Sequence, residues 1–412
     1  MTMLPSKNGF HAAAINTGLF LVSLVVALLL AELGLRLVES AGRQSIGAEI
    51  PLHQLNYNNP SVSVVQAPDT VRVLSFGDSF AYGIVKPPYS YHQIAATALS
   101  AAGLPYDVVN LGEPAISFPQ YLQAHQQWSK VLDHDAVLIN IYVGNDIADV
   151  TYGYVEKNAD PHHALAALEA NAQSGEGLMP SGNLEDILGR VNFVPRAFPL
   201  RIIDYAYAIY LSLTQVITPT DMTLNPDVYI PAVVSLNDDD FLQVQRSIAS
   251  VFDPSRLRLH QTGYESAVEL ARYLQGQADE RPVWVLLSPP QMAVDKALHN
   301  RLLLQLDQPW DIDLPFVLLE NIFATVAPSV KVVPLDSLLR CATQTQGPMY
   351  VERDTHWNQA GNQVVGIAVA SALSIPDEGL LTIGNTQCPF IQSRRVLTAE
   401  EKILVQELTA VR

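Results

Sequence analysis

Residues 71–83 read VRVLSFGDSFAYG, and this stretch decides the fold that we expect. The first six residues are mostly apolar and β-branched or aromatic, which is typical of a short buried strand. Gly77 and Asp78 then break the strand, and Ser79 follows on a turn. A serine just past a buried parallel strand is held at the sheet edge where ligands of open α/β sheets bind. The stretch therefore predicts a candidate nucleophile, although the same residues also suit an ordinary turn.

The composition excludes some classes of protein. The chain has 412 residues, a formal net charge of −17, 49% hydrophobic residues and 16% charged residues. This length permits two or three units with a large core, and the apolar content argues against extensive disorder. The sequence has no basic run, so we expect no nucleic-acid partner.

A nearly unbroken apolar run, centred on LFLVSLVVALLLA, covers residues 12–31. Twenty helical residues span about 30 Å, the hydrocarbon thickness of a bilayer. Glu39 stands where a signal-peptide cleavage site requires a small residue, which favours an uncleaved anchor. We therefore expect residues 1–43 to form a single-pass membrane anchor rather than a buried core helix. The nearly balanced flanking charges leave its orientation open, and residues 44–70 are expected to be a spacer.

Strand and helix patterns alternate after this spacer. Further strands are expected at 106–111, 136–143, 283–288 and 330–335, and helices at 89–102, 117–130, 263–279, 294–306, 316–326, 359–373 and 398–411. This alternation predicts an α/β fold with a parallel five-stranded sheet between two helical layers, formed by residues 71–150 and 261–375. Residues 336–348 are expected to be a polar loop. Residues 376–412 are a tail that ends in a helix.

The pattern is lost between residues 151 and 260, which we interpret as an insertion. It either caps the candidate site or packs beside the domain, and its apolar piece is Ile202–Ile217. The acidic run Asp238–Asp240 and the pair His162–His163 are expected to be solvated rather than metal-binding.

The two cysteines, Cys341 and Cys388, are too few and too far apart for a metal site. They either form one disulfide in an oxidising compartment or remain two buried thiols, and the sequence leaves both open. We expect no metal and no cofactor.

Five polar or small residues follow the expected strands or precede the helix at 359–373, and they should meet at one edge of the sheet. These residues are Ser79, Gly112, Asn145, Asp354 and His356. They permit acyl transfer, with Ser79 as nucleophile, His356 as base and Asp354 as the group that orients the imidazole. The N–H groups of Ser79 and Gly112 and the side-chain amide of Asn145 are the expected oxyanion donors.

Four short blocks carry these residues in order, reading GDSF at 77–80, NLG at 110–112, GND at 144–146 and DTHW at 354–357. Together they resemble the four blocks of the SGNH, or GDSL-like, hydrolases, which are named for Ser, Gly, Asn and His. The resemblance covers about 71–150 and 283–375. It implies a flavodoxin-like three-layer α/β/α fold and a metal-free serine esterase activity.

Two departures refine the resemblance. GND lacks the residue that usually separates Gly from Asn, and Asp354 lies two residues before His356, where three is usual. The D-x-H-W pattern is similar to that of SGNH-like proteins of the alginate acetylation group, which O-acetylate exopolysaccharides at the cell envelope. This implies a glycan ester or small acyl ester as substrate, an acyl-donor membrane protein as partner, and a domain outside the cytoplasmic membrane.

Alternatives remain at this point. Hydrolysis and acyl transfer differ only in the final acceptor, and the fold also suits a non-catalytic glycan-binding or assembly protein. An apolar trench lined by 202–217 would indicate a lipase-like esterase instead. For Asp354 to reach His356 Nδ1, the loop between them must be non-helical, because residues two apart on a helix diverge. The helix should then begin after Trp357, with Asn358 as its N-cap.

Overall fold

The structure, a computed structural model, describes residues 62–152, 224–225, 227–230, 236–304, 310–374, 380–390 and 394–410, with 49–50, 58–59 and the single positions 23 and 27. The expected anchor at 12–31 and most of the insertion, including 162–163 and 202–217, lie outside these residues. The chain divides into two compact units, 1–47 with 177–216 and 48–176 with 217–412. The second unit contains the five-stranded sheet and the candidate site. Within the residues just given, no helix combines the length and hydropathy that crossing a bilayer requires.

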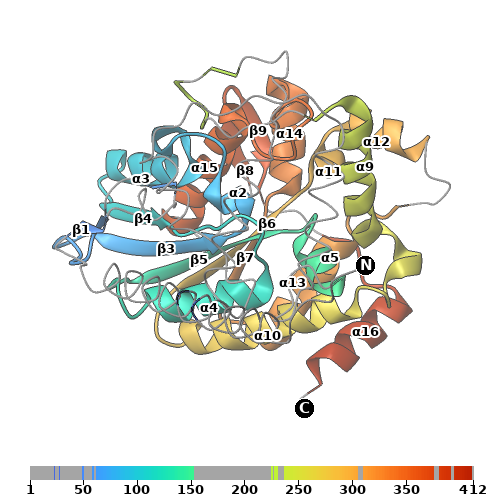
Figure 1. Ribbon diagram of the computed structural model, residues 1–412, viewed down its shortest axis with the longest axis horizontal. Coiled ribbons are helices and arrows are strands. Elements are labelled where there is room, and N and C mark those ends of the chain that lie inside the picture. Colours follow the sequence, from blue (N-terminus) through green and yellow to red (C-terminus); the bar gives the residue numbers. More distant parts are fainter. Residues whose placement is uncertain are drawn as a thin grey trace, which may run out of the picture. The chain divides into compact units, whose positions relative to one another are not determined.

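A parallel five-stranded sheet forms the centre of this unit (Figure 1). Its strands are β3 (Val71–Gly77), β4 (Tyr106–Asn110), β5 (Ala136–Tyr142), β6 (Val283–Ser288) and β7 (Lys331–Pro334). They lie in the order β4-β3-β5-β6-β7, which is the strand order of flavodoxin-like sheets. β5 and β6 are buried along their whole length, as expected for a sheet covered on both faces. The predicted five-stranded parallel sheet is confirmed.

Helices cover both faces of the sheet (Figure 1). One layer contains α3 (Tyr91–Ala101), α14 (Asp336–Gln346) and α15 (Gln359–Ser374), and the other contains α4 (Phe118–Trp128), α10 (Gln261–Ala278) and α13 (Leu314–Val326). α15 packs closely on α3, where a Cβ added at Gly366 would lie 2.5 Å from Ile94 Cγ2. Glycine at this position is therefore a condition of the close packing that holds the first layer together.

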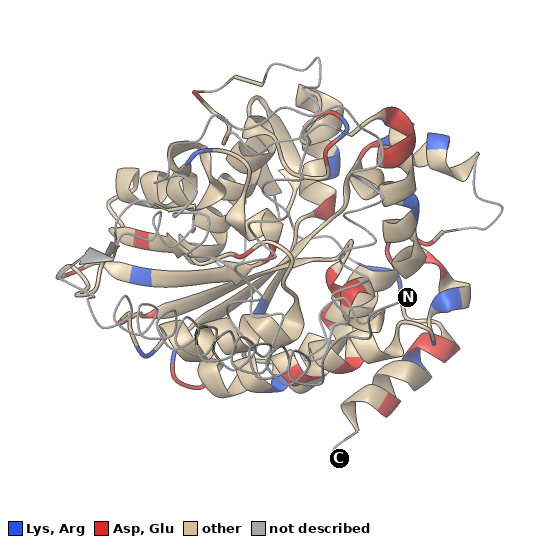
Figure 2. Ribbon diagram, in the orientation of Figure 1, with Lys and Arg blue, Asp and Glu red and all other residues tan. Residues whose placement is uncertain are grey.

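Shorter elements complete the described part. They are β1 (Glu49–Ile50), β2 (Val62–Ser63), α2 (Ser79–Tyr82), η2 (Pro87–Tyr89), α5 (Asp146–Thr151), α9 (Asp238–Ala249), η3 (Ser250–Phe252), η4 (Pro254–Arg256), α11 (Gln291–Val294), α12 (Lys296–Leu303), β8 (Leu380–Ile383), β9 (Thr386–Pro389) and α16 (Ala399–Thr409). Figure 2 shows acidic residues gathered at the start of α9. They suit this place, because negative side chains stabilise the N-terminal end of a helix dipole.

One expectation about secondary structure was wrong. Residues 336–346 were expected to lie in a polar loop, but they form α14. Leu338, Leu339 and Ala342 are buried on one side of this helix, and Thr343 and Gln344 lie on its more exposed part. The apolar positions are three or four residues apart, as in an amphipathic helix. The polar residues between them made the segment resemble a loop, so the helical period was overlooked.

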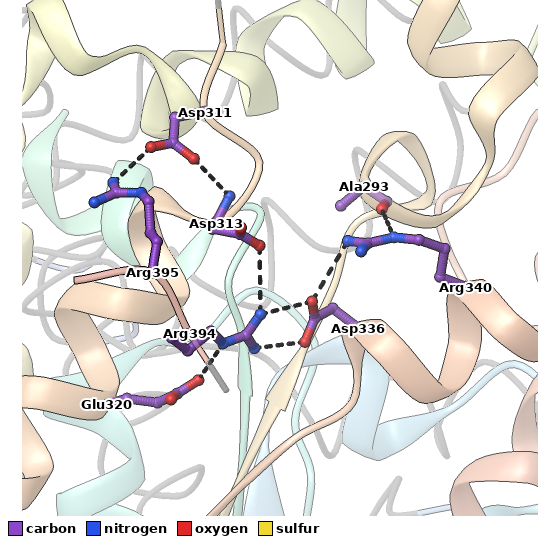
Figure 3. Close-up of polar contacts among 8 residues, drawn as sticks. All are labelled: Ala293, Asp311, Asp313, Glu320, Asp336, Arg340, Arg394 and Arg395. Carbon is purple, nitrogen blue, oxygen red and sulfur yellow. Dashed lines mark hydrogen bonds and ion pairs between the residues drawn. The ribbon is translucent and has the colours of Figure 1, made fainter. Parts of the chain in front are cut away.

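The C-terminal tail is fastened to α13 and α14 by charged groups (Figure 3). Arg394 forms ion pairs with Asp336 at 2.6 Å and with Glu320 at 2.8 Å. Arg340 approaches the same Asp336 carboxylate at 3.5 Å. Asp336 is fully buried, and a buried carboxylate is tolerated only when cations or hydrogen bonds satisfy it. These pairs therefore fix the tail to the domain.

A disulfide makes a second attachment of the tail. Cys341 in α14 is bonded to Cys388 in β9, 47 residues later in the chain. Of the two alternatives for the cysteines, the structure therefore has the bonded pair. A capping box begins the last helix, since Thr398 and Glu401 bond each other's backbone N–H groups at the start of α16.

The end of the expected spacer packs against the domain. Asn58 and Asn59 are both buried. The Asn58 side-chain amide donates to the carbonyls of Tyr82 at 2.8 Å and Val85 at 2.7 Å. The segment that enters the domain therefore holds the chain that follows α2.

Candidate active site

Ser79 is the first residue of α2, and one residue, Asp78, separates it from the end of β3. A Cβ at Gly77 would lie 2.6 Å from the carbonyl oxygen of Asn140 on β5, so only glycine permits this close approach of the turn. Asp78 caps α2, with its Oδ1 accepting from the N–H of Phe80 at 2.9 Å. This confirms Asp78 as a residue that bonds the turn. Ser79 itself is partly exposed at the carboxyl edge of the sheet.

Asp354 and His356 lie on the loop between α14 and α15. Asp354 Oδ1 accepts from the backbone N–H of His356, and it lies 2.7 Å from the imidazole Nδ1. The loop is non-helical, because Arg353 has a φ of 56° and the backbone N–H of Val351 donates to the carbonyl of His356 at 3.0 Å. The predicted contact between Asp354 and His356 Nδ1 is therefore present.

The predicted start of the following helix is also present. α15 begins at Gln359, and the N–H of Gly361 donates to Asn358 Oδ1 at 2.9 Å, as expected for an N-cap. A second bond from the Asn358 side chain, to the carbonyl of Pro348 at 2.8 Å, fixes the loop from the other side. The helix start and the loop conformation are thus set together by one asparagine.

Ser79 and His356 line one small pocket. Its other lining residues are Phe80, Gly83, Ile84, Trp357 and Asn362. The Phe80 ring lies 5.2 Å from the His356 ring and 5.0 Å from the Trp357 ring, and these aromatic contacts hold the imidazole in place. His356 Nε2 is buried and has no hydrogen-bond partner in the part of the chain that the structure describes. This nitrogen is therefore available to accept a proton.

The surroundings of His356 make it a stronger base. Burial lowers the pKa of the imidazole, but the hydrogen bond and charge of Asp354, with the charge of Asp78, outweigh burial and raise the pKa above its ordinary value. A carboxylate can only accept at Nδ1, so Asp354 keeps the proton on that nitrogen. The lone pair is then on Nε2, as a general base requires.

Gly112 lies at the site, but its N–H is already engaged. It donates to Asn110 Oδ1 at 3.0 Å, and the residue is buried. A Cβ at Gly112 would lie 2.4 Å from the backbone nitrogen of Tyr82, so glycine lets the loop after β4 pass close to α2. Asparagine bonding the N–H two residues later is a common turn, so NLG itself contained the signal for this bond.

Ala115 is a residue that the sequence did not indicate. It has a φ of 61°, in the left-handed region that few non-glycine residues adopt. The N–H of Glu113 donates to the carbonyl of Gly77 at 3.0 Å, and Pro114 has no N–H. Ala115 therefore carries the first N–H after Gly112 that makes no hydrogen bond within the described residues. Strained backbone of this kind is concentrated at functional sites.

Asn145 lies at the N-cap position of α5 and is partly exposed. Its side chain is a neighbour of Asp78. Burial raises the pKa of Asp78 to about 7, against the lowering effects of the Phe80 N–H, the charge of His356 and the Asn145 side chain. The structure thus brings Asn145, Asp78 and His356 close enough to influence one another.

Two further carboxyl groups, those of Asp146 and Asp149 in α5, lie near Asp78. Asp146 is fully buried and accepts from the Tyr121 hydroxyl at 2.7 Å and from the Tyr142 N–H at 3.0 Å. Burial and the charge of Asp78 raise the pKa of Asp146 well above its ordinary range and that of Asp149 to about 7. Burial is a tertiary property, so no local pattern predicts that these carboxyls gather near Asp78.

Comparison with known proteins yields distant structural likenesses. No protein-family model matches the chain, and no curated protein matches it. Among solved structures, it is similar to the α/β hydrolase LAE5 from the metagenome of Lake Arreo, Spain, with a TM-score of 0.33 and 13% identity over 74% of this chain and 96% of that chain. It is also similar to a carbohydrate esterase family 2 enzyme with a carbohydrate-binding domain from Corynascus thermopiles (Myceliophthora fergusii), with a TM-score of 0.32 and 14% identity over 76% of this chain and 69% of that chain.

Proposed function

We propose that the protein is an SGNH-type serine ester hydrolase or O-acyltransferase that acts through an acyl-serine intermediate on Ser79. One observation carries the proposal. A histidine whose Nδ1 is held by Asp354, and whose Nε2 has no partner among the described residues, lines the same pocket as a serine at the carboxyl edge of the sheet. This is the set of groups that activation of a serine hydroxyl requires.

In the proposed reaction, His356 Nε2 takes the proton from Ser79 Oγ as this oxygen attacks the ester carbonyl. The tetrahedral intermediate then collapses, and the alcohol leaves with the proton from His356. Water or a sugar hydroxyl next attacks the acyl-serine, with His356 again taking the proton. An acid or a new ester is released, and Ser79 regains its hydrogen.

The negative oxygen of each tetrahedral intermediate requires hydrogen-bond donors. The N–H of Ser79 and the side-chain amide of Asn145 are proposed for this role. Gly112 is the proposed third donor, and its N–H would first have to leave Asn110 Oδ1, to which it donates at 3.0 Å. Removal of one such donor typically reduces kcat by about 10²–10³-fold.

The proposed substrate is a short acyl ester, with acetyl as the acyl group, carried by a cell-envelope or exopolysaccharide glycan. The resemblance of the D-x-H-W block to that of O-acetylating proteins supports acetyl as the acyl group. The resemblance of the D-x-H-W block supports the glycan. An acyl-donor membrane protein is the proposed partner if the acceptor is a sugar hydroxyl.

The proposed location is outside the cytoplasmic membrane, on a single N-terminal anchor. The apolar run at 12–31 supports the anchor. The disulfide between Cys341 and Cys388 supports an oxidising compartment for the domain. Protease digestion of cells with a permeabilised outer barrier tests this location. Protection of the domain until the inner membrane is broken would contradict it.

The activity is tested with the detergent-solubilised full chain and p-nitrophenyl acetate. We expect release of p-nitrophenol, an acetyl adduct on Ser79 in mass spectra, and no turnover by Ser79→Ala. Ser100→Ala, an exposed serine on α3, is the matched control and should retain full turnover. Added oligosaccharide distinguishes the two reactions, because a transferase acetylates it at the expense of acetate. Turnover by folded Ser79→Ala at the wild-type rate contradicts the proposal.

A further inference from the structure

The pocket has two walls that come from distant parts of the chain. Ser79, Gly83 and Ile84 belong to the wall that continues from α2 towards η2. His356 and Asn362 belong to the wall formed by the loop before α15 and the start of that helix. His356 Nε2 makes no hydrogen bond within the described residues, so the reacting side chains do not hold the walls together. Their separation must be fixed by other contacts.

A short segment from the second half of the expected insertion, residues 228–230, lies against the first wall. The N–H of Lys86 donates to the carbonyl of Val228 at 2.7 Å, and the N–H of Ile230 donates to the carbonyl of Ile84 at 3.0 Å. Between these bonds, Val85 and Tyr229 form an antiparallel bridge. Main-chain hydrogen bonds therefore fix Tyr229 to the wall that carries Ser79.

The side chain of Tyr229 reaches the second wall. Its hydroxyl accepts from the backbone N–H of Gln359, the first residue of α15, at 3.3 Å. This N–H is one of the donors that a helix leaves without an internal partner. It lies three residues after His356. The same chain segment makes another contact with this wall, because the N–H of Leu236 donates to the carbonyl of Arg353 at 2.9 Å.

We propose that Tyr229 is a positioning residue that sets the separation between Ser79 and the base His356. Its backbone is bonded to one wall and its hydroxyl to the other. The inference rests on the proposed function, because it concerns the geometry of that same pair. A displacement of about 1 Å between reacting groups can reduce turnover by about 10²-fold. Loss of the Tyr229 hydroxyl should therefore lower kcat more than it weakens substrate binding.

Further contacts between the walls limit the size of the effect. The Phe80 ring of α2 lies 5.2 Å from the His356 ring and 5.0 Å from the Trp357 ring. The N–H of Tyr91 donates to Asn362 Oδ1 at 3.2 Å, which joins the chain after η2 to α15 in the buried interior. Loss of the Tyr229 bond should therefore loosen the walls without separating them. We expect a kcat reduced by about 10- to 100-fold, with KM changed by less than about twofold.

Two variants remove opposite halves of the same bond. Tyr229→Phe deletes only the hydroxyl and keeps the ring and the bridge to Val85. Gln359→Pro removes the backbone N–H that donates to Tyr229. The helix should remain intact, because Gln359 is exposed and the first position of a helix tolerates proline. Both should show the same loss of kcat with p-nitrophenyl acetate, and the double variant should show no further loss.

Tyr106→Phe is the matched control. The Tyr106 hydroxyl also bonds a backbone group at 3.3 Å, the carbonyl of Leu373, but it lies at the start of β4 and outside the pocket lining. It should lower Tm by about as much as Tyr229→Phe and leave kcat unchanged. Equal kcat in wild type and folded Tyr229→Phe overturns the inference. Additive losses in the double variant overturn it too, since the two groups would then act separately.

Ser79→Ala separates this inference from the proposed function. An inactive Ser79→Ala with a fully active Tyr229→Phe contradicts only the role of Tyr229. Full turnover by Ser79→Ala contradicts the proposed function and the inference that rests on it. The expected result is an inactive Ser79→Ala, with Tyr229→Phe and Gln359→Pro slowed to the same level.

Discussion

Asp354 and His356 are joined twice through one oxygen atom. Asp354 Oδ1 accepts from the backbone N–H of His356 at 2.7 Å and lies 2.7 Å from its ring Nδ1. The backbone bond fixes the distance between the two residues, so the carboxylate meets the imidazole without any contribution from a third element. A spacing of two residues therefore serves this orienting contact well, provided that the loop stays non-helical.

Asp354→Asn should reduce kcat by about 10⁴-fold while the fold is retained. The amide keeps the size of the carboxylate, but it removes the charge and can favour the wrong tautomer of His356. Turnover of p-nitrophenyl acetate and the Tm of both proteins check this prediction. Asp133→Asn, at an exposed position, is the control and should behave as wild type. A folded Asp354→Asn enzyme at near full rate would mean that another group orients the imidazole.

The pH dependence of kcat/KM should show an acid limb above pH 6.5, the ordinary pKa of histidine. The His356 imidazole must be neutral to take a proton, and its pKa is raised despite burial, because Asp354 and Asp78 favour the charged form. Activity should therefore rise with pH through this raised pKa. Asp78→Asn should move the limb to lower pH. A limb at or below 6.5 in the wild type would contradict the raised pKa.

Asp78 should make the folded protein less stable as pH rises. Burial raises the pKa of Asp78 from 3.8 to about 7, so the folded state retains a proton that the unfolded chain releases at lower pH. The stability that protonated Asp78 contributes is complete below about pH 4 and is lost as pH rises through about 7. Tm measured from pH 4 to 8 should fall less steeply in Asp78→Asn than in the wild type. Parallel curves would count against a buried, titrating Asp78.

Asn58→Ala should lower both stability and kcat. The substitution leaves the carbonyl of Val85 without its side-chain donor, whereas the carbonyl of Tyr82 keeps Asn110 Nδ2 at 3.1 Å. An unsatisfied buried polar group costs about 1–3 kcal/mol. The chain between α2 and η2 should then hold Ser79 less firmly. Thermal unfolding and ester turnover measure the two effects. Asn300→Ala, at an exposed position in α12, should change stability by less than about 0.5 kcal/mol. An Asn58→Ala protein as stable as this control would contradict the bracing role.

The sequence predicted the sheet because each strand is an apolar run that ends in turn residues. The same pattern placed Ser79, Asn145 and His356 after strand ends or before a helix, and the D-x-H spacing predicted the contact with Asp354. These features are local, so a linear sequence contains them.

The features that were missed depend on long-range packing. Tyr229 meets Val85 and Gln359, which are more than 100 residues away in either direction, and no local pattern encodes such a pairing. The burial of Asp146 likewise depends on Tyr121 from another helix. α14 is the exception, because its amphipathic period was present in the sequence and was hidden by intervening polar residues.

The attachment of the tail to α14 has a consequence for biosynthesis. Asp354 and His356 lie in the loop that the Cys341–Cys388 disulfide closes, and Arg394 completes the attachment still later in the chain. Ser79 leaves the ribosome roughly 280 residues before His356, an interval of about 15–55 s at usual rates of translation. On the proposed function, an unfinished chain carries the nucleophile without its base. Under that proposal the catalytic pair is incomplete until residues 354–356 have been made, and the loop that carries them is closed only when Cys388 pairs with Cys341.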